Sequence, residues 1–336
     1  MPITAKELAK LLNLSEAAVS MALNNKPGVS TQTRKKVIAL AKDKGYDFSR
    51  LEQTQLPSGP SGTIQFIIYR KNGAVVGDTP FFSQLSEGID TGCRQASYFL
   101  NITYLYEDDN LPNQLSKLLA PGCRGIILLG TEMDEHAFAP FLTLPVPIVV
   151  LDTFFEGISA NYVQIANVQG AFLAAGHLIR KYRTQPGYLR SSYPIGNFSE
   201  RADGFYKAIR KNGMPASKSP VHTLSPSMEG AYEDMRELLR QGEAPARCYF
   251  ADNDLIAAGA VRALKEAGYR IPQDVSLIGF DDMPLCTYVE PALSTVRVPK
   301  QYMGQMAVRR LTELIADKNA SPVKIEIETS LVLRQS

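Results

Sequence analysis

The sequence predicts an α/β protein in which a small all-helical head precedes a larger two-lobed body, and three observations support this prediction. The first 50 of the 336 residues contain three short amphipathic segments and no strand-like run. Residues 56–62, LPSGPSG, form a linker in which Pro and Gly forbid regular structure. After the linker, short apolar strands alternate with amphipathic helices, which is typical of parallel sheets covered on both faces. About 270 such residues exceed what one hydrophobic core usually organises, so two lobes are expected.

Three helices are expected in the head, and each begins after a residue that can cap it. Thr4 and Glu7 form a capping box, in which each side chain bonds to the backbone N–H of the other residue. Ser15 caps the second helix and Ser30 the third. Gly45 follows the last apolar residue of the third helix and ends it.

The body is expected to contain at least seven strands and six helices, assigned from apolar runs and from helical periodicity. The predicted strands are residues 63–69, 101–106, 125–129, 148–151, 187–190, 248–251 and 275–279. The predicted helices are residues 82–97, 168–182, 199–211, 228–240, 254–267 and 301–316.

Charge is distributed unevenly along the chain. Residues 1–50 carry nine Lys and Arg against four Asp and Glu, a net charge of +5, whereas the remainder carries −3. A basic head on a mildly acidic body indicates a polyanion as partner of the head alone, although a solvated basic surface is an alternative.

Composition also indicates where the protein works. No apolar run approaches the ~18 residues of a membrane span, and the N-terminus lacks the basic and apolar regions of a signal peptide. The four cysteines lie far apart, without a CxxC pair, so neither a zinc site nor a disulfide framework is expected. We therefore expect a soluble cytoplasmic protein with no membrane partner and no cofactor.

The first two head helices have the spacing of a helix-turn-helix motif. The second begins with the small residues Ser15, Ala17, Ala18 and Ser20, which allow close approach to the DNA major groove. The N-terminus of such a helix can also hold a phosphate. A three-helix bundle without a ligand has the same spacing, so this alternative stays open.

The head and the body both resemble one protein family. Residues 9–25, AKLLNLSEAAVSMALNN, look like the N-terminal signature of the lac repressor (LacI-type) family of bacterial transcriptional regulators. In the body, residues 80–82 (PFF), 200–205 (ERADGF) and 271–282 (IPQDVSLIGFDD) are similar to further motifs of that family. The resemblance therefore covers nearly the whole chain.

The resemblance implies a fold and a division into domains. A DNA-binding head would span residues 1–47 and a hinge residues 48–62, followed by a body like type I periplasmic sugar-binding proteins. Lobe 1 would comprise about 63–160 and 292–320, and lobe 2 about 161–291 and 321–336. The C-terminal strands, 324–327 and 330–333, would return to complete the second lobe.

The resemblance and the motifs together assign candidate site residues. The candidates for DNA binding are Thr4, Ser15, Glu16, Ala17, Ala18, Ser20, Met21, Asn24, Ser30, Arg34 and Leu56. The candidates for binding an effector between the lobes are Phe81, Phe82, Asp152, Arg201, Asn253 and Asp281. Carboxylate, amide and guanidinium groups suit the hydroxyls of a sugar, and aromatic rings suit its apolar face.

Structural roles compete with some of these assignments. Asp281 and the following Asp could cap the next helix, Arg201 could belong to a surface i,i+4 pair, and Asn253 could be an N-cap. One of the two phenylalanines could belong to the core alone.

The chain departs from the family pattern at two places. Met21 stands where most relatives carry an Arg that can fork onto guanine, and Glu16 stands where a neutral residue is common, so a different operator half-site is expected. In the hinge, Phe48 and Glu52 replace Pro and a small apolar residue. Leu56 lies one position late for the family's wedge into the minor groove, so either the hinge helix shifts by one residue or DNA bending is weaker than in the family.

The expected function is that of a dimeric repressor that reads a pseudo-palindromic operator and responds to a sugar or sugar phosphate. Two alternatives stay open: a regulator co-repressed by a purine or another metabolite, and a cytoplasmic sugar-binding protein whose head no longer binds DNA. The C-terminus has no heptad tail, which favours a dimer over a tetramer. Catalysis is not expected, because the sequence lacks the P-loop, GxGxxG, HExxH and GxSxG motifs.

Overall fold

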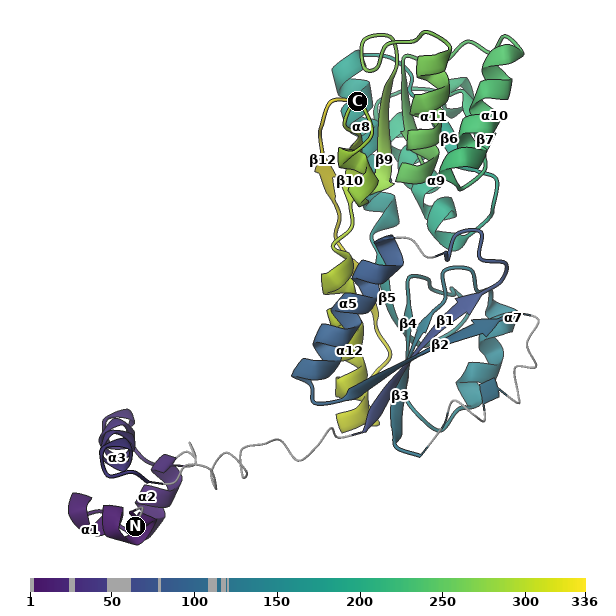
Figure 1. Ribbon diagram of the computed structural model, residues 1–336. Coiled ribbons are helices and arrows are strands. Elements are labelled where there is room, and N and C mark those ends of the chain that lie inside the picture. The colour runs from purple at the N-terminus through teal and green to yellow at the C-terminus, as the bar shows by residue number, and fades with distance from the viewer. Residues whose placement is uncertain are drawn as a thin grey trace. The chain divides into compact units, whose positions relative to one another are not determined.

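The computed structural model describes residues 3–23, 28–46, 62–77, 80–107, 114–115, 119 and 121–336. The chain divides into two compact units, Met1–Ser61 and Gly62–Ser336. Both are drawn in Figure 1. Among the helices of the described residues, none is both long enough and apolar enough to span a membrane.

The first unit contains the three expected helices, α1 (Ala5–Leu12), α2 (Glu16–Leu23) and α3 (Thr31–Asp43). All three expected caps form: the Oγ atoms of Thr4, Ser15 and Ser30 each accept a backbone N–H three residues later, at 3.1–3.3 Å. The Glu7 carboxylate completes the capping box by accepting from the Thr4 backbone N–H at 2.7 Å. One apolar cluster joins the helices; its fully buried members are Leu8, Val19, Ala22, Val37 and Ala41.

The first lobe of the body is built on a six-stranded sheet in the order β11-β5-β4-β3-β1-β2, with every pair parallel. Its strands are β1 (Thr63–Arg70), β2 (Phe99–Tyr106), β3 (Cys123–Leu129), β4 (Ile148–Leu151), β5 (Asn161–Ile165) and β11 (Lys324–Ile327). Its helices are α5 (Pro80–Gln95), α7 (Glu135–Phe138), the 3-10 helix η1 (Ala139–Thr143) and α12 (Lys300–Ala316). Helices α5 and α12 lie side by side (Figure 1), so closely that a Cβ atom at Gly88 would overlap the backbone of Gln301.

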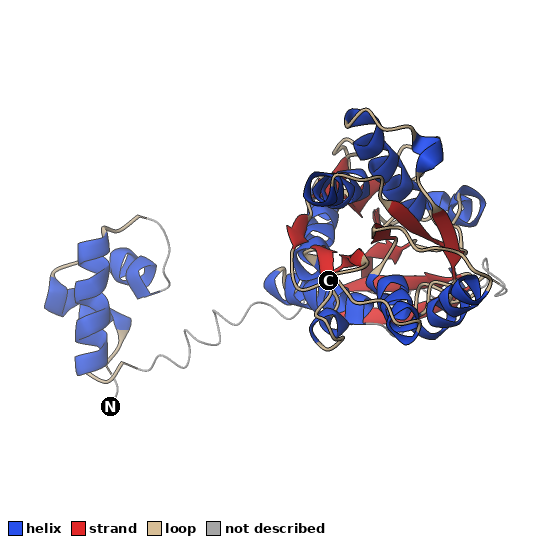
Figure 2. Ribbon diagram, turned by 90° about the horizontal axis from the view of Figure 1, so that it is seen from above, coloured by secondary structure: helices blue, strands red, loops and turns tan. Residues whose placement is uncertain are grey.

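The second lobe has a six-stranded sheet in the order β12-β10-β9-β8-β6-β7, parallel except for β12 beside β10. Its strands are β6 (Gly187–Ser191), β7 (Val221–Leu224), β8 (Cys248–Ala251), β9 (Ser276–Asp281), β10 (Ser294–Arg297) and β12 (Ser330–Val332). Its helices are α8 (Asn167–Tyr182), α9 (Gly196–Lys211), α10 (Met228–Arg240) and α11 (Asp254–Glu266), with 3-10 helices η2 (Ala216–Lys218) and η3 (Pro284–Thr287). Figure 2 shows helices around the strands of the body, and β8 and β9 are buried along their whole length. The α/β architecture with an N-terminal helical unit is as predicted.

The assignment of the last segments to the two lobes differs from the expectation. Strand β10, expected in the first lobe, pairs with β9 in the second, and strand β11, expected in the second, pairs with β5 in the first. Strand β5 also belongs to the first lobe, although residues 161–165 were expected in the second. The physical reason is that the chain crosses between the sheets through short links at residues 166, 298–299 and 328–329, so each crossing falls where a strand ends.

Candidate functional site

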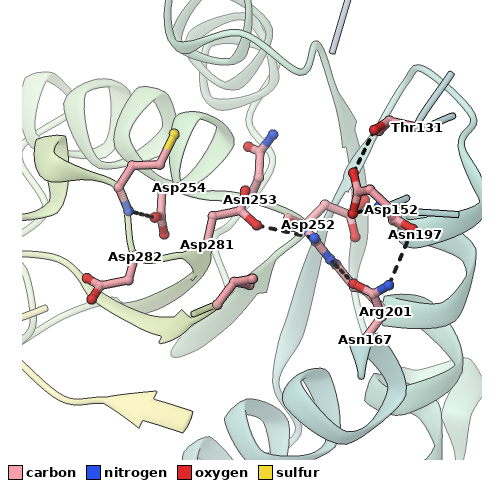
Figure 3. Close-up of polar contacts among 12 residues, drawn as sticks. Thr131, Asp152, Asn167, Asn197, Arg201, Asp252, Asn253, Asp254, Asp281 and Asp282 are labelled. Carbon is pink, nitrogen blue, oxygen red and sulfur yellow. Dashed lines mark hydrogen bonds and ion pairs between the residues drawn. The ribbon is translucent and has the colours of Figure 1, made fainter. Parts of the chain in front are cut away.

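A cavity between the two lobes brings together all six residues that the sequence nominated for the effector. From the first lobe come Phe81 and Phe82 at the start of α5 and Asp152 just after β4; from the second come Arg201 on α9, Asn253 just after β8, and Asp281 at the end of β9. Parallel strands of each sheet present their carboxyl ends at one edge, which is where α/β folds place ligand-binding side chains. Figure 3 shows how the polar members lie.

Asp152 is held from both lobes. Its Oδ2 accepts the Thr131 hydroxyl at 2.6 Å, and its Oδ1 accepts the Asn197 side-chain amide at 3.0 Å. Asp152 itself has a left-handed backbone conformation, with φ of +65°. Burial raises the pKa of this carboxyl to about 7, although the Thr131 hydroxyl and the Arg201 guanidinium act in the opposite direction. The carboxyl therefore carries a proton far more readily than an exposed aspartate.

Arg201 is the buried centre of the polar network, with only 3% of its surface exposed. Its guanidinium donates to Asn167 Oδ1 at 2.9 Å, to the Asp252 carbonyl at 2.5 Å, and to Asp281 Oδ1 at 3.2 Å. It also stacks on the ring of Phe280, 3.8 Å from the centroid. These contacts rule out the alternative of a surface i,i+4 pair.

Asp281 ends strand β9 in a strained conformation, with φ of +106°. Burial raises the pKa of its carboxyl, and the neighbouring cations Arg201 and Lys300 partly offset this rise. The Lys300 ammonium, itself buried, donates to the Asp281 main-chain carbonyl at 2.5 Å. Asp282 instead bonds to Arg297 and Arg334, each at 2.6 Å. Neither aspartate caps the following helix η3, whose N-cap is a methionine without a side-chain bond.

Asn253 has two roles at once. Its Oδ1 accepts the Ile256 backbone N–H at 2.9 Å and so caps α11, as the structural alternative proposed, while the residue also lines the cavity. Phe81 and Phe82 combine roles in the same way, since both belong to the main apolar cluster and both line the cavity. Their rings meet edge to face with centroids 5.0 Å apart.

Several cavity residues escaped the sequence analysis. Those that supply polar atoms are Thr131, which follows β3 as Asp152 follows β4, and Asn197, which lies one helical turn before Arg201 on α9. Thr131 could have been identified because it follows a predicted strand, where α/β folds place ligand-binding side chains. Asn197 could have been identified because residues at i and i+4 share one face of a helix, and Arg201 is four residues later. The apolar additions are Val75, Ile195, Phe198, Pro226, Leu255 and Met283.

In the head, the DNA-binding candidates cluster around α2. Ser15, Glu16, Ala17 and Ser20 are exposed, whereas Ala18 and Met21 are half-buried. Outside α2, Thr4 and Ser30 serve as helix caps with exposed side chains, and Arg34 is half-buried on α3. Asn24 and Leu56 lie outside the described residues.

Comparison with known proteins decides the family. The chain is 31% identical over 306 residues to the HTH-type transcriptional regulator GalS of Salmonella typhimurium, covering 91% of this chain and 88% of that protein. The chain belongs to the LacI family of transcriptional regulators. It is also 28% identical to the HTH-type transcriptional repressor PurR of Mannheimia succiniciproducens, over 99% of this chain and 98% of that repressor.

The effector domain of this LacI-family regulator is supported separately. Residues 175–336 match the model of the periplasmic binding protein-like domain. A solved structure of a LacI-family regulator from Enterococcus faecium, with bound ribose, is 25% identical with a TM-score of 0.69, covering 81% of this chain and 98% of that one. The protein is thus a DNA-binding regulator with an effector-binding domain, and its relatives are transcription regulators rather than enzymes.

Proposed function

We propose that this LacI-family protein is a repressor whose operator affinity is controlled by a neutral monosaccharide bound between Asp152 on the first lobe and Arg201 and Asp281 on the second. The observation that carries the proposal is the arrangement of these three side chains around one cavity. A ligand that bonds to groups on both lobes favours one arrangement of the lobes over others, which is the differential affinity that a switch requires.

The charges of the cavity favour an uncharged polyol over a sugar phosphate. Among the described residues that line it, the charged groups are two aspartates and Arg201, and the guanidinium is already bonded to Asp281 and to a main-chain carbonyl. A phosphate would meet two buried carboxyls and compete with one of them for the same cation. Hydroxyl groups, by contrast, can donate to carboxylate oxygens and accept from an amide.

The aromatic wall is compatible with the same class of ligand. Phe81, Phe82 and Phe198 all line the cavity and present flat apolar surface beside the polar groups. The Enterococcus faecium relative holds ribose, which supports a sugar here as well. A purine would also stack on these rings, so purines enter the test as the competing class.

The proposed site for DNA is the exposed surface of α2, where Ser15, Glu16, Ala17 and Ser20 project. We further propose that two copies pair, so that two heads read the two halves of a pseudo-palindromic operator. Within the described part of the chain, strand β2 pairs only with β1, at one end of the first sheet, and it exposes Phe99, Ile102, Tyr104 and Tyr106. A second copy that covers this edge would remove apolar surface and unpaired backbone groups from water.

The decisive experiment is a binding screen on the full chain by isothermal titration calorimetry with D-ribose, D-galactose, D-glucose, ribose 5-phosphate and hypoxanthine. A neutral monosaccharide that binds the wild type and is lost in Asp281→Asn supports the proposal. Asp90→Asn, on exposed α5 surface, serves as the charge-matched control. Binding of hypoxanthine alone would overturn the sugar assignment, and tightest binding of ribose 5-phosphate would overturn the charge argument.

A further inference from the structure

The loop that follows β1 contributes one residue to the wall of the cavity, and its described part contains neither helix nor strand. Its described part runs through residues 71–77, ahead of α5. Val75 lines the cavity, and the next residue, Val76, is buried in the main apolar cluster. Gly73 has φ of +72°, so the chain turns sharply between the end of β1 and Val75.

One carboxylate bonds to nearly every backbone N–H of this loop. Glu132 Oε2 accepts the backbone N–H of Lys71 at 2.9 Å, of Asn72 at 3.3 Å and of Gly73 at 3.0 Å. Glu132 Oε1 accepts those of Val75 at 2.7 Å and Val76 at 2.8 Å. Five donors from six consecutive residues thus converge on the two oxygens of one side chain.

The surroundings of Glu132 make these bonds strong. The residue is only 5% exposed, so water competes poorly for its oxygens. Burial tends to raise the pKa of the carboxyl, but the bonds from Val76, Val75, Gly73 and Lys71 together lower it below its ordinary value. The carboxylate is therefore the stable form in this position, and it acts as the anion around which the loop folds.

The position of Glu132 in the chain connects the loop to the effector site. It directly follows Thr131, a cavity-lining residue whose hydroxyl donates to Asp152 Oδ2. Of two adjacent residues after β3, Thr131 therefore orients the Asp152 carboxyl in the cavity, and Glu132 holds the loop that contributes Val75 to its wall. The same segment also faces the second lobe, since Glu132 and Lys71 share a surface hollow with Tyr193 and Ile195.

We propose that Glu132 is a positioning residue for the effector: its carboxylate holds the 71–77 loop in place, so that Val75 closes the cavity and the affinity for the ligand depends on Glu132. This rests on the proposed function, because it assumes that the cavity is where the effector binds. Glu132 does not itself line the cavity. A structural role alone would lower stability without altering the affinity of the molecules that remain folded.

The first test measures the loop directly and needs no ligand. In Glu132→Gln, an NH₂ group replaces one acceptor oxygen, so two or three of the five convergent bonds lose their acceptor. Hydrogen–deuterium exchange of the full chain should then be at least tenfold faster in peptides covering residues 71–77. Peptides covering α9 should be unchanged. Glu135→Gln, on exposed α7 nearby, is the charge-matched control and should leave both rates unchanged. Unchanged exchange at 71–77 in Glu132→Gln would overturn the proposal.

A second variant guards against a misfolded Glu132→Gln protein. Gly73→Ala introduces strain at φ of +72° but no clash, since the nearest atom to the new Cβ, the Val76 carbonyl oxygen, is 3.8 Å away. It should speed exchange of the same peptide while Glu132 stays intact.

The last test measures affinity by calorimetry with the sugar that binds the wild type most tightly among D-ribose, D-galactose and D-glucose. We expect at least a tenfold loss in Glu132→Gln and in Gly73→Ala, and none in Glu135→Gln. Faster exchange with unchanged affinity would overturn the positioning role. If no sugar binds the wild type, the proposed function fails, while the exchange result still decides whether Glu132 holds the wall.

Discussion

The ion pair between Arg201 and Asp281 allows a quantitative test of how the cavity is stabilised. The two side chains are 3% and 12% exposed and lie 3.2 Å apart. Removing the cation by Arg201→Met leaves the Asp281 carboxyl buried without its partner, and Asp152 also loses a nearby positive charge. Breaking a buried pair from one side costs about 3–5 kcal/mol of unfolding free energy.

The corresponding change in melting temperature follows from the size of the body. Unfolding entropy of about 2.1 cal/mol/K per residue gives roughly 0.6 kcal/mol/K for a unit of this length, so Arg201→Met should lower Tm by about 5–9 °C. Asp281→Asn removes the charge that is left unpaired. The double variant should therefore be less destabilised than the sum of the single variants, by roughly 1–3 kcal/mol.

Urea unfolding of the wild type, both single variants and the double variant measures this coupling at pH 7.5. The control is Arg94→Met, whose side chain is 78% exposed and pairs with Asp90 on the surface of α5. It should cost less than about 0.5 kcal/mol. Additive effects of Arg201→Met and Asp281→Asn on the unfolding free energy would refute the reasoning, because they would mean that Arg201 does not stabilise the ionised Asp281 carboxylate.

Three further predictions concern the switch, the pH dependence and the head. Asp281→Asn should abolish release of operator by the effector while leaving operator affinity within about threefold, and an unchanged response in a gel-shift assay would exclude Asp281 from the site. Burial raises the pKa of Asp152 to about 7 from an ordinary 3.8, so the protonated carboxyl contributes fully to the stability of the folded state below pH 4. This contribution to stability is lost as the pH rises through 7. The stability of Asp152→Asn relative to the wild type should therefore increase between pH 5 and pH 8, and equal differences in urea unfolding at both pH values would contradict this. We expect Arg34 to contact a DNA phosphate, so Arg34→Ala should make the negative slope of log operator affinity against log salt concentration shallower by about one. An unchanged slope would exclude Arg34 from the DNA interface.

Features that depend on short-range rules were predicted well from the sequence. The caps at Thr4, Ser15 and Ser30 form because a hydroxyl three residues before a backbone N–H needs no tertiary context. Asp152 directly follows β4 of the first sheet and Asp281 ends β9 of the second, and residues at the carboxyl ends of both sheets line the same cavity. Polar residues at the carboxyl end of a predicted strand can thus be identified from the sequence as candidates for ligand binding.

Features that depend on pairing between distant segments were not predicted from the sequence. Strands β5, β7 and β10 have five, four and four residues, too short to show a period against their surroundings. Their pairing partners decide which lobe they join, and this is why β10 and β11 were assigned to the wrong lobes. Glu132 escaped for a similar reason, because its five partners lie 56–61 residues earlier and share no pattern with it.

The links between the lobes include one that bonds directly to the proposed effector site. Among the described residues the chain crosses between the two sheets three times, and one crossing runs from β10 to α12. Lys300, the first residue of α12, donates to the carbonyls of Asp281 at 2.5 Å, Asp282 at 3.3 Å and Val298 at 3.4 Å. Its ammonium also lies 5.6 Å from the ring of Phe81. The strained end of β9, which carries a cavity carboxyl, is therefore bonded to the helix that packs beside α5. Because α5 and α12 both belong to the first lobe, we propose that a shift of Asp281 on ligand binding is transmitted to that lobe through Lys300.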